Sequence, residues 1–277
     1  MPNVVILAGP NGAGKTSAAP VLLRDRLEVT EFVNADVIAR GLSGFSAESV
    51  AVEAGRVMLR RLDELAMARI DFAFESTLSG TSFLRSIDRW RANAYIIRVV
   101  YLWLSSPDAA IRRVRRRVQQ GGHSVPEDVI RRRYERSMAN FASLYRTAAD
   151  EWQLYDNTET PVPRLLARGD RDRAEVIEQG GWLAFERAAA RISRVKEVVM
   201  TGRPPIPDDH VARAFADVAG MRHAMDIAAA RVIRRHRLLN EPLVSARNGE
   251  IVYLDPHTVA MPGGVTEEEM GPVFDYL

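Results

Sequence analysis

The sequence predicts an α/β fold in which helices cover both faces of a parallel β-sheet. Two observations predict it: short apolar runs alternate with helical patterns over residues 4–155, and a glycine-rich loop follows the first apolar run. The chain has 277 residues, of which 47% are hydrophobic and 27% are charged. This length suffices for one large α/β domain and a small additional module.

Five apolar runs are candidate strands, and polar residues cluster at their carboxyl ends, where ligands bind on sheets of this kind. The strands are expected at residues 4–7, 31–33, 72–75, 98–104 and, more weakly, 153–155. The clearest helices between them are expected at about 47–68 and 107–119.

The loop after the first strand reads Gly-Pro-Asn-Gly-Ala-Gly-Lys-Thr over residues 9–16, a complete G-x-x-x-x-G-K-[ST] phosphate loop. Its glycines let backbone N–H groups curl round a phosphate, and the following helix adds its positive N-terminal dipole. Lys15 is expected to reach the β- and γ-phosphates and Thr16 to hold Mg²⁺. The predicted binding residues for ATP or GTP are Gly9, Pro10, Asn11, Gly12, Ala13, Gly14, Lys15, Thr16 and Ser17.

The composition changes near residue 200, where a long helical pattern ends and residues 201–207 contain three prolines and a glycine. Residues 208–239 are expected to form one helix, or two that break at Gly220. Two apolar runs around Asn248-Gly249 then predict a hairpin. We therefore expect a first domain over 1–199 and a helix and β-hairpin module over 200–277.

Composition also excludes several classes of protein. The chain has no cysteine, which excludes disulfides and thiolate metal sites. We expect a cytoplasmic protein with no signal peptide and no membrane partner, because the first strand begins at once and no apolar run is long enough to span a bilayer. The net charge of +2 gives no strong signal for nucleic acid.

Two classes that use this loop lack their other motifs here. A transport-type ATPase needs a Leu-Ser-Gly-Gly-Gln signature and a strand that ends in Asp-Glu, but the run 98–104 ends in Ser-Ser-Pro. A switch GTPase needs Asn-Lys-x-Asp, which is absent.

A small-molecule kinase explains more of the sequence, because it needs a base for the acceptor hydroxyl. Asp36 follows the second strand and is the candidate base, although an aspartate there also commonly caps a helix. Glu75 ends the third strand and is expected to orient the acceptor or a Mg²⁺-bound water, or else to meet water or a structural arginine. Ser76 and Thr77 are expected to bind the acceptor or to start the next helix.

An arginine-rich segment then predicts a helical lid with cations for the transferring phosphoryl group. Most of these arginines must be solvated, since five in six positions cannot share one helix face. Nucleic-acid binding is the rival interpretation, but no aromatic residues interleave the run. His123 is expected to stabilise the turn between the helices. The arginines are Arg112, Arg113, Arg115, Arg116, Arg117, Arg131, Arg132 and Arg133.

Over about residues 3–145 the chain resembles the zeta-toxin family of phosphate-loop kinases. The resemblance rests on the order and spacing of 9–16, Asn-Ala-Asp at 34–36, Glu-Ser-Thr-Leu-Ser-Gly at 75–80, Arg-x-x-x-Gly-Gly-His-x-Val-Pro at 117–126 and Arg-Arg-Arg-Tyr-x-Arg-Ser at 131–137. It implies a three-layer phosphate-loop kinase that phosphorylates a hydroxyl of a UDP-activated amino sugar, UDP-N-acetylglucosamine in the best-known members. The Gly-Gly-His lid departs from those members, which leaves the acceptor open.

By position, the resemblance makes Asp36 the general base and Glu75 an acceptor contact. It makes Arg117 and Arg133 the arginines on the phosphoryl group, with Arg116 and Arg132 as the next choices. It also implies a toxin that an antitoxin restrains, either in trans or through residues 200–277. The alternative for that segment is a stabilising extension. A metabolic, nucleoside or antibiotic kinase and a nucleotide-dependent binding module remain the alternative functions.

Overall fold

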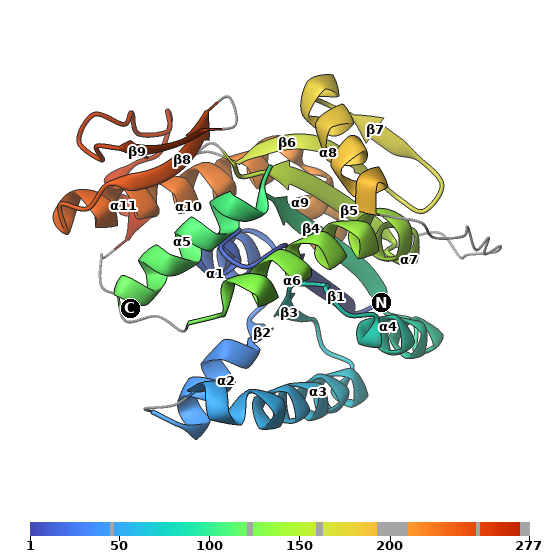
Figure 1. The fold of residues 1–277 in the computed structure, drawn as a ribbon. Coiled ribbons are helices and arrows are strands. Elements are labelled where there is room, and N and C mark those ends of the chain that lie inside the picture. Colours follow the sequence, from blue (N-terminus) through green and yellow to red (C-terminus); the bar gives the residue numbers. More distant parts are fainter. Residues whose placement is uncertain (45–46, 121–123, 159–162, 193–209, 248–249, 272–277) are drawn as a thin grey trace.

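The fold is seen in a computed structural model, which describes residues 1–44, 47–120, 124–158, 163–192, 210–247 and 250–271. A seven-stranded sheet with the order β2-β3-β1-β4-β5-β6-β7 forms its centre (Figure 1). The pairs among β1 to β5 are all parallel, which confirms the predicted α/β fold. These strands are β1 (Asn3–Ala8), β2 (Glu31–Val33), β3 (Phe72–Ser76), β4 (Ile96–Trp103) and β5 (Glu151–Asp156).

Two further strands extend the sheet and were not predicted. β6 (Arg164–Gly169) pairs antiparallel with β5, and β7 (Ala174–Val176) pairs antiparallel with β6. All three residues of β7 are exposed, so this strand lacks the apolar run by which a buried strand is recognised in a sequence.

Helices cover both faces of the sheet, as the alternation of side chains on β4 shows. On one face Arg98 lies 5.9 Å from the ring centroid of Phe215, and on the other the ring centroids of Trp103 and Phe185 lie 5.6 Å apart. The first face carries α1 (Lys15–Ala19), its π-helical continuation η1 (Pro20–Arg26), α9 (His210–Ala216) and α10 (Val218–Leu238). The second carries α4 (Ser82–Ala92), α6 (Glu127–Asn140), η3 (Phe141–Tyr145), α7 (Arg146–Ala148) and α8 (Gln179–Ile192).

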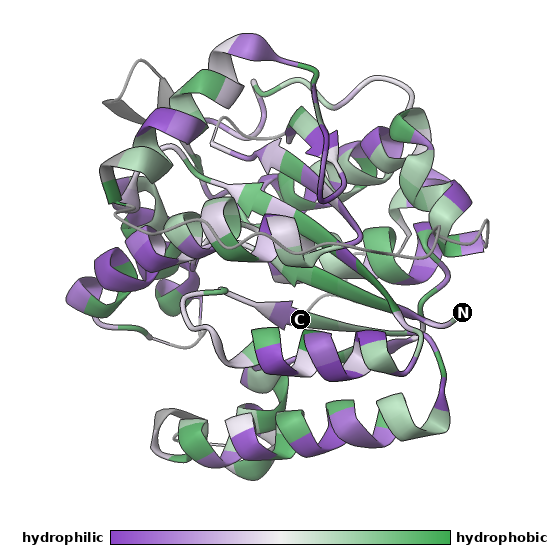
Figure 2. Cartoon of the chain, turned by 90° about the vertical axis from the view of Figure 1, so that its right-hand side faces the viewer, coloured by the Kyte–Doolittle hydropathy of each residue, from purple (hydrophilic) through white to green (hydrophobic). Residues whose placement is uncertain are grey.

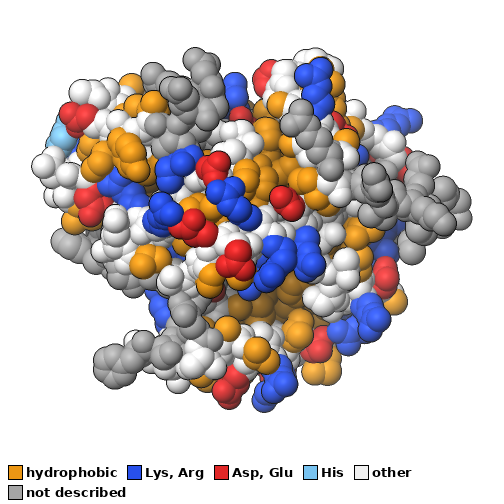
Figure 3. Space-filling view, in the orientation of Figure 1, with side chains coloured by type: hydrophobic (Ala, Val, Ile, Leu, Met, Phe, Trp, Pro, Cys, Tyr) orange, Lys and Arg blue, Asp and Glu red, His pale blue; other side chains and the backbone are white. Residues whose placement is uncertain are grey.

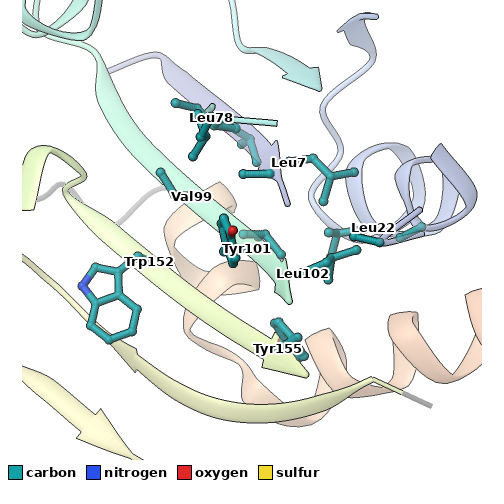
Figure 4. Packing of buried hydrophobic residues seen from close by; sticks show 14 of the residues in the cluster. Leu7, Leu22, Leu78, Val99, Tyr101, Leu102, Trp152 and Tyr155 are labelled. Carbon is teal, nitrogen blue, oxygen red and sulfur yellow. The ribbon is translucent and has the colours of Figure 1, made fainter. Parts of the chain in front are cut away.

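The central strands form the hydrophobic core. Every residue of β1 and β4 is buried, the pattern expected of parallel strands with helices on both faces. The strands appear as a mostly apolar layer in Figure 2, whereas the outer helices alternate between polar and apolar residues. Figure 4 labels members of this cluster from β1, η1, β4 and β5, among them Leu7, Leu22, Leu102 and Tyr155.

Two helix pairs project from the sheet beside the carboxyl ends of its strands. α2 (Ala35–Leu42) and α3 (Ala51–Ala68), joined by the 3₁₀ turn η2 (Ala47–Val50), follow β2. α5 (Pro107–Gln119) follows β4 and packs on α6, which gives the predicted helical lid. Ion pairs link these two lid helices, Arg115 with Glu127 and Arg131 with Asp108. The turn that holds His123 lies outside the described residues.

The C-terminal part differs from the prediction in where its helices break. The break falls at Asp217 and not at Gly220, because the Asp217 side chain accepts a 3.0 Å hydrogen bond from the Gly220 N–H and caps α10. The predicted hairpin is confirmed as β8 (Leu243–Arg247) paired with β9 (Glu250–Leu254), and α11 (Glu267–Met270) follows. Residues 193–209, which include the predicted linker and the 199/200 boundary, and the hairpin turn at 248–249 lie outside the described residues.

Buried side chains from α9 and α10 belong to the same core as the sheet. Val211 and Phe215 on α9, and Met221 and Met225 on α10, are at most 3% exposed. The start of the C-terminal segment is therefore built into the hydrophobic core of the first domain. In the described part of the chain, no helix is both long enough and apolar enough to cross a membrane.

Candidate active site

The phosphate loop lies between β1 and α1, as predicted, and its shape depends on glycine. Gly9 has a φ of 141°, and a Cβ there would lie 2.2 Å from the carbonyl oxygen of Leu102 in β4. Gly14, with a φ of 88°, precedes α1 and gives the helix no side-chain cap. The first N–H groups of α1 therefore remain available to an anion, which is what a phosphate site requires.

Lys15 is folded onto its own loop. Its ammonium group donates to the carbonyl oxygens of Gly9 (2.9 Å) and Pro10 (3.0 Å) and lies 3.6 Å from Oε1 of Glu75. The residue is only 5% exposed. Burial lowers the pKa of Lys15, the charges of Glu75 and Asp36 oppose that shift, and the charge of Arg117 adds to it.

Glu75 joins three elements at the carboxyl edge of the sheet. Its Oε2 accepts hydrogen bonds from the Thr16 hydroxyl (2.9 Å) and from Nδ2 of Asn34 (2.8 Å), while Oε1 faces Lys15. Parallel strands bring this about, because β1, β3 and β2 are neighbours and end on the same side. The Glu75 carboxylate thus contacts the phosphate loop directly, and its role toward an acceptor or a metal-bound water stays a prediction.

Asp36 is exposed and lies in the first turn of α2. It comes two residues after Asn34, the residue that links β2 to this helix. The alternative that Asp36 caps the helix is wrong, because Asn34 is the cap: its Oδ1 accepts from the N–H groups of Asp36 (2.8 Å) and Val37 (3.3 Å). The Asp36 carboxylate is thereby left available, in a first turn where negative charge is favoured. Asn34 holds Glu75 with its amide nitrogen and Asp36 with its oxygen.

Ser76 and Thr77 shape the loop after β3. The Ser76 hydroxyl accepts from the N–H of Leu78 (3.0 Å), and the hydroxyls of Thr77 and Ser79 lie 2.9 Å apart. The alternative that they start the next helix is wrong, since α4 begins at Ser82.

The lid arginines divide by the direction in which they point. Arg117 is close enough to Lys15 to lower its pKa, whereas Arg116 lies 3.6 Å from Glu241 in the C-terminal segment. Arg132 and Arg133 are exposed on α6. Arg133 is on the same flank of α6 as Asn140, seven residues on, whose side chain donates to the carbonyl of Leu78 (2.8 Å). Figure 3 shows basic side chains gathered over the lid helices.

Arg113 and Asn157 brace the phosphate loop. Arg113 was one of the candidate lid arginines and not a predicted support of the loop, and Asn157 was not predicted to act at all. Arg113 donates to the carbonyl oxygens of Asn157 (2.8 Å) and Gly12 (3.5 Å), and burial lowers its pKa to about 10. Nδ2 of Asn157 donates to the carbonyl of Ala13 (2.9 Å). Little in the sequence marks these two residues: Arg113 is one arginine within an arginine-rich run, and Asn157 follows the most weakly predicted strand.

A hollow of about 430 Å³ lies beside Asn34, between β2, α2 and α3. The described residues that line it are apolar at its centre and charged at its edges: Glu31, Phe32, Val33, Asn34, Val37, Ile38, Val57, Arg60, Arg61 and Glu64. Asn34 and Val37 flank Asp36 in the chain, so the hollow adjoins the turn that carries the candidate base. This hollow, which has room for part of an acceptor, was not predicted from the sequence.

Comparisons with known proteins agree with this geometry. The sequence model of the zeta toxin family matches residues 1–162. An uncharacterized protein of Haemophilus influenzae is 25% identical over 130 residues, which are 47% of this chain and 91% of that protein.

Among solved structures, the native AvrRxo1-ORF1:AvrRxo1-ORF2 complex is similar in fold, with a TM-score of 0.55 and 14% identity over 83% of this chain and 80% of that chain. A structure of that complex with ATP gives a TM-score of 0.54 and 17% identity over 82% and 76% of the two chains. A structure from the PezAT toxin–antitoxin system of Streptococcus pneumoniae gives a TM-score of 0.47 and 12% identity over 69% of this chain and 87% of that chain.

Proposed function

The chain belongs to the zeta toxin family and has the fold of a phosphate-loop kinase, and from this premise we propose that it transfers the γ-phosphate of ATP to a hydroxyl of a small molecule. The observation that carries the proposal is the network in which Glu75 joins Lys15, Thr16 and Asn34, with Asp36 on the next turn. A donor site and a candidate base thus lie at one edge of the sheet, as phosphoryl transfer requires.

The donor half of the site is the phosphate loop. Its N–H groups and the start of α1 would hold the phosphates, and the Lys15 ammonium would exchange the carbonyl oxygens of Gly9 and Pro10 for phosphate oxygens. Because Lys15 is buried, its charge would act on the phosphates with little screening by water.

The donor set also fits Mg²⁺. The Thr16 hydroxyl would be a direct ligand, and Glu75, which accepts a hydrogen bond from it, offers a hard carboxylate oxygen beside the metal or one of its waters. When bound, the ion would neutralise charge on the phosphates.

The acceptor half would be formed by Asp36 and the hollow beside it. The exposed Asp36 carboxylate would take the proton from the acceptor hydroxyl as that oxygen attacks the γ-phosphate. Glu75, Ser76 and Thr77 would contact the acceptor near the reacting hydroxyl. Apolar residues such as Phe32 and Val57, with Arg60 at the edge, would suit an acceptor that combines a flat ring with anionic groups.

The resemblance to the zeta toxin family implies a UDP-activated amino sugar, which has this combination, and UDP-N-acetylglucosamine is therefore the acceptor that we propose. Arg117 and Arg133 would stabilise the charge on the transferring phosphoryl group. In support, the charge of Arg117 lowers the pKa of Lys15, and Arg133 lies on the same flank of α6 as Asn140, which contacts the loop after β3.

The biological role that we propose is that of the toxin of a toxin–antitoxin pair, with an antitoxin that acts in trans or within residues 200–277. An ATP-consuming kinase of a cell-wall precursor would stop growth, and the antitoxin would restrain it.

The experiment that tests this function uses γ-labelled ATP. The purified chain is incubated with UDP-N-acetylglucosamine and, separately, with a metabolite extract. Label in UDP-N-acetylglucosamine supports the proposed acceptor, label in another metabolite supports a kinase with a different acceptor, and no labelled metabolite contradicts the kinase proposal. Induced expression then separates a toxin, which arrests growth, from a metabolic kinase, which does not.

A further inference from the structure

The C-terminal segment packs against the lid helix α5 with β8, and one of its side chains, that of Glu241, makes polar contacts with this helix. The carboxylate of Glu241, between α10 and β8, accepts a hydrogen bond from Nε2 of Gln120 and lies 3.6 Å from Nη2 of Arg116. The Arg116 side chain is only 15% exposed and that of Glu241 33%, so water screens this pair less than a surface pair. Glu241 lies outside the match to the family, which ends at residue 162, whereas Arg116 and Gln120 lie within it.

Hydrogen bonds hold the backbone of Glu241 against the end of α10. Asn240 has a φ of 50° and ends α10, after which the Glu241 N–H donates to the carbonyl of His236 (2.9 Å). The Glu241 carbonyl in turn accepts from Nδ1 of His236 (3.2 Å). Because α10 is anchored in the core by Met221 and Met225, Glu241 is held on a rigid support.

Arg116 and Arg117 are consecutive on α5, so their side chains leave the helix about 100° apart. Glu241 pairs with the first of them, and the charge of the second lowers the pKa of Lys15. Rotation or displacement of α5 would move both together.

We propose that Glu241 is a positioning residue of the kinase: it holds the second half of α5 through Arg116 and Gln120, and thereby fixes the stretch of this helix that carries the neighbouring Arg117. This inference rests on the proposed function. It makes the C-terminal segment a support for the active lid, in contrast to an inhibitor that acts by blocking the site.

The test compares Glu241→Ala and Glu241→Gln with Glu267→Ala in the full chain. Glu267 is a matched control, because it pairs with Arg234 (3.3 Å) within the C-terminal segment. Hydrogen exchange of the amides of residues 114–120 measures the lid, and steady-state kinetics separate kcat from KM for ATP.

We expect Glu241→Ala to speed exchange of these amides by about tenfold, the effect of one lost charge-assisted hydrogen bond. We also expect kcat to fall by a similar factor while KM for ATP and the melting temperature change little. Glu241→Gln should lie between this variant and wild type, and Glu267→Ala should match wild type. In an Arg116→Ala background, Glu241→Ala should have a smaller effect on exchange, because its partner is already gone.

Equal exchange in Glu241→Ala and Glu267→Ala would overturn the proposal, and so would a kcat that rises in Glu241→Ala, since the contact would then restrain the lid. Failure of the kinase proposal gives a different result. If the wild-type chain labels no acceptor, the exchange rates still decide whether Glu241 holds α5.

Discussion

The Thr16 hydroxyl donates a 2.9 Å hydrogen bond to the carboxylate of Glu75, across 59 residues of sequence. This bond joins the end of the phosphate loop to the end of β3. Because the same carboxylate also accepts from Asn34 and faces Lys15, one side chain couples the donor site to the turn that carries Asp36.

Glu75→Gln removes the charge of this carboxylate and keeps its size. We expect the rate of phosphotransfer at saturating ATP to fall by at least about tenfold, a loss of 1.4 kcal/mol or more in transition-state stabilisation. Glu175→Gln is the control, because Glu175 on β7 pairs with Arg168, at the opposite edge of the sheet from β2. A Glu75→Gln rate within a factor of two of the control would exclude this role.

Arg117→Ala removes the lid arginine that faces Lys15. We expect kcat to fall by about a hundredfold or more, the usual effect of losing one donor to a developing charge, with a small change in ATP affinity. Arg115→Ala should be nearly neutral, since Arg115 is exposed and pairs with Glu127 at the surface. If both variants lose the same activity, the lid does not act through Arg117.

The buried Lys15 predicts a pH dependence. Burial lowers its pKa from the ordinary value of 10.5, so the ammonium loses its proton at a lower pH than an exposed lysine. The charged form binds phosphate, and therefore kcat/KM for ATP should fall as the pH rises through this lowered pKa. Lys15→Arg keeps its charge over this range, so whatever activity it retains should show no such decline. A decline at the same pH in both proteins would assign the titration to another group.

The core position of α9 predicts that the C-terminal segment is needed for folding. Phe215 is 3% exposed, and Phe215→Ala should lower the free energy of unfolding by about 3–5 kcal/mol. Tyr253→Ala is the control, since Tyr253 is 65% exposed on β9. We expect a chain that lacks residues 200–277 to aggregate. If the shortened chain instead folds cooperatively with an unchanged melting temperature, the segment is a separate module.

The sequence predicted the parallel part of the fold because buried strands and a phosphate loop leave local patterns. β2 and α5 were predicted with the bounds that the structure shows, and Glu75 was correctly placed at a strand end. What the sequence did not reveal depends on tertiary contacts. Asn34 caps α2 with its side-chain oxygen, while its amide nitrogen donates to Glu75, 41 residues further along the chain.

The edge strands and the C-terminal contacts were missed for a similar reason. β7 is wholly exposed and has no apolar pattern. The helix break falls at Asp217 because its side chain caps α10, although Gly220 nearby is the more obvious helix breaker in the sequence. The contact of Glu241 with Arg116 forms only once α10 is packed against the core. Local signals of this kind are weak until the fold is known.

The most direct test of the central claim is the rate of label transfer from γ-labelled ATP by Asp36→Ala, measured beside its affinity for ATP. If Asp36 is the base, transfer to the acceptor should be nearly abolished while the dissociation constant for ATP stays close to that of wild type. A variant that binds ATP normally and keeps more than about a tenth of the wild-type rate, a loss below 1.4 kcal/mol, would contradict the account.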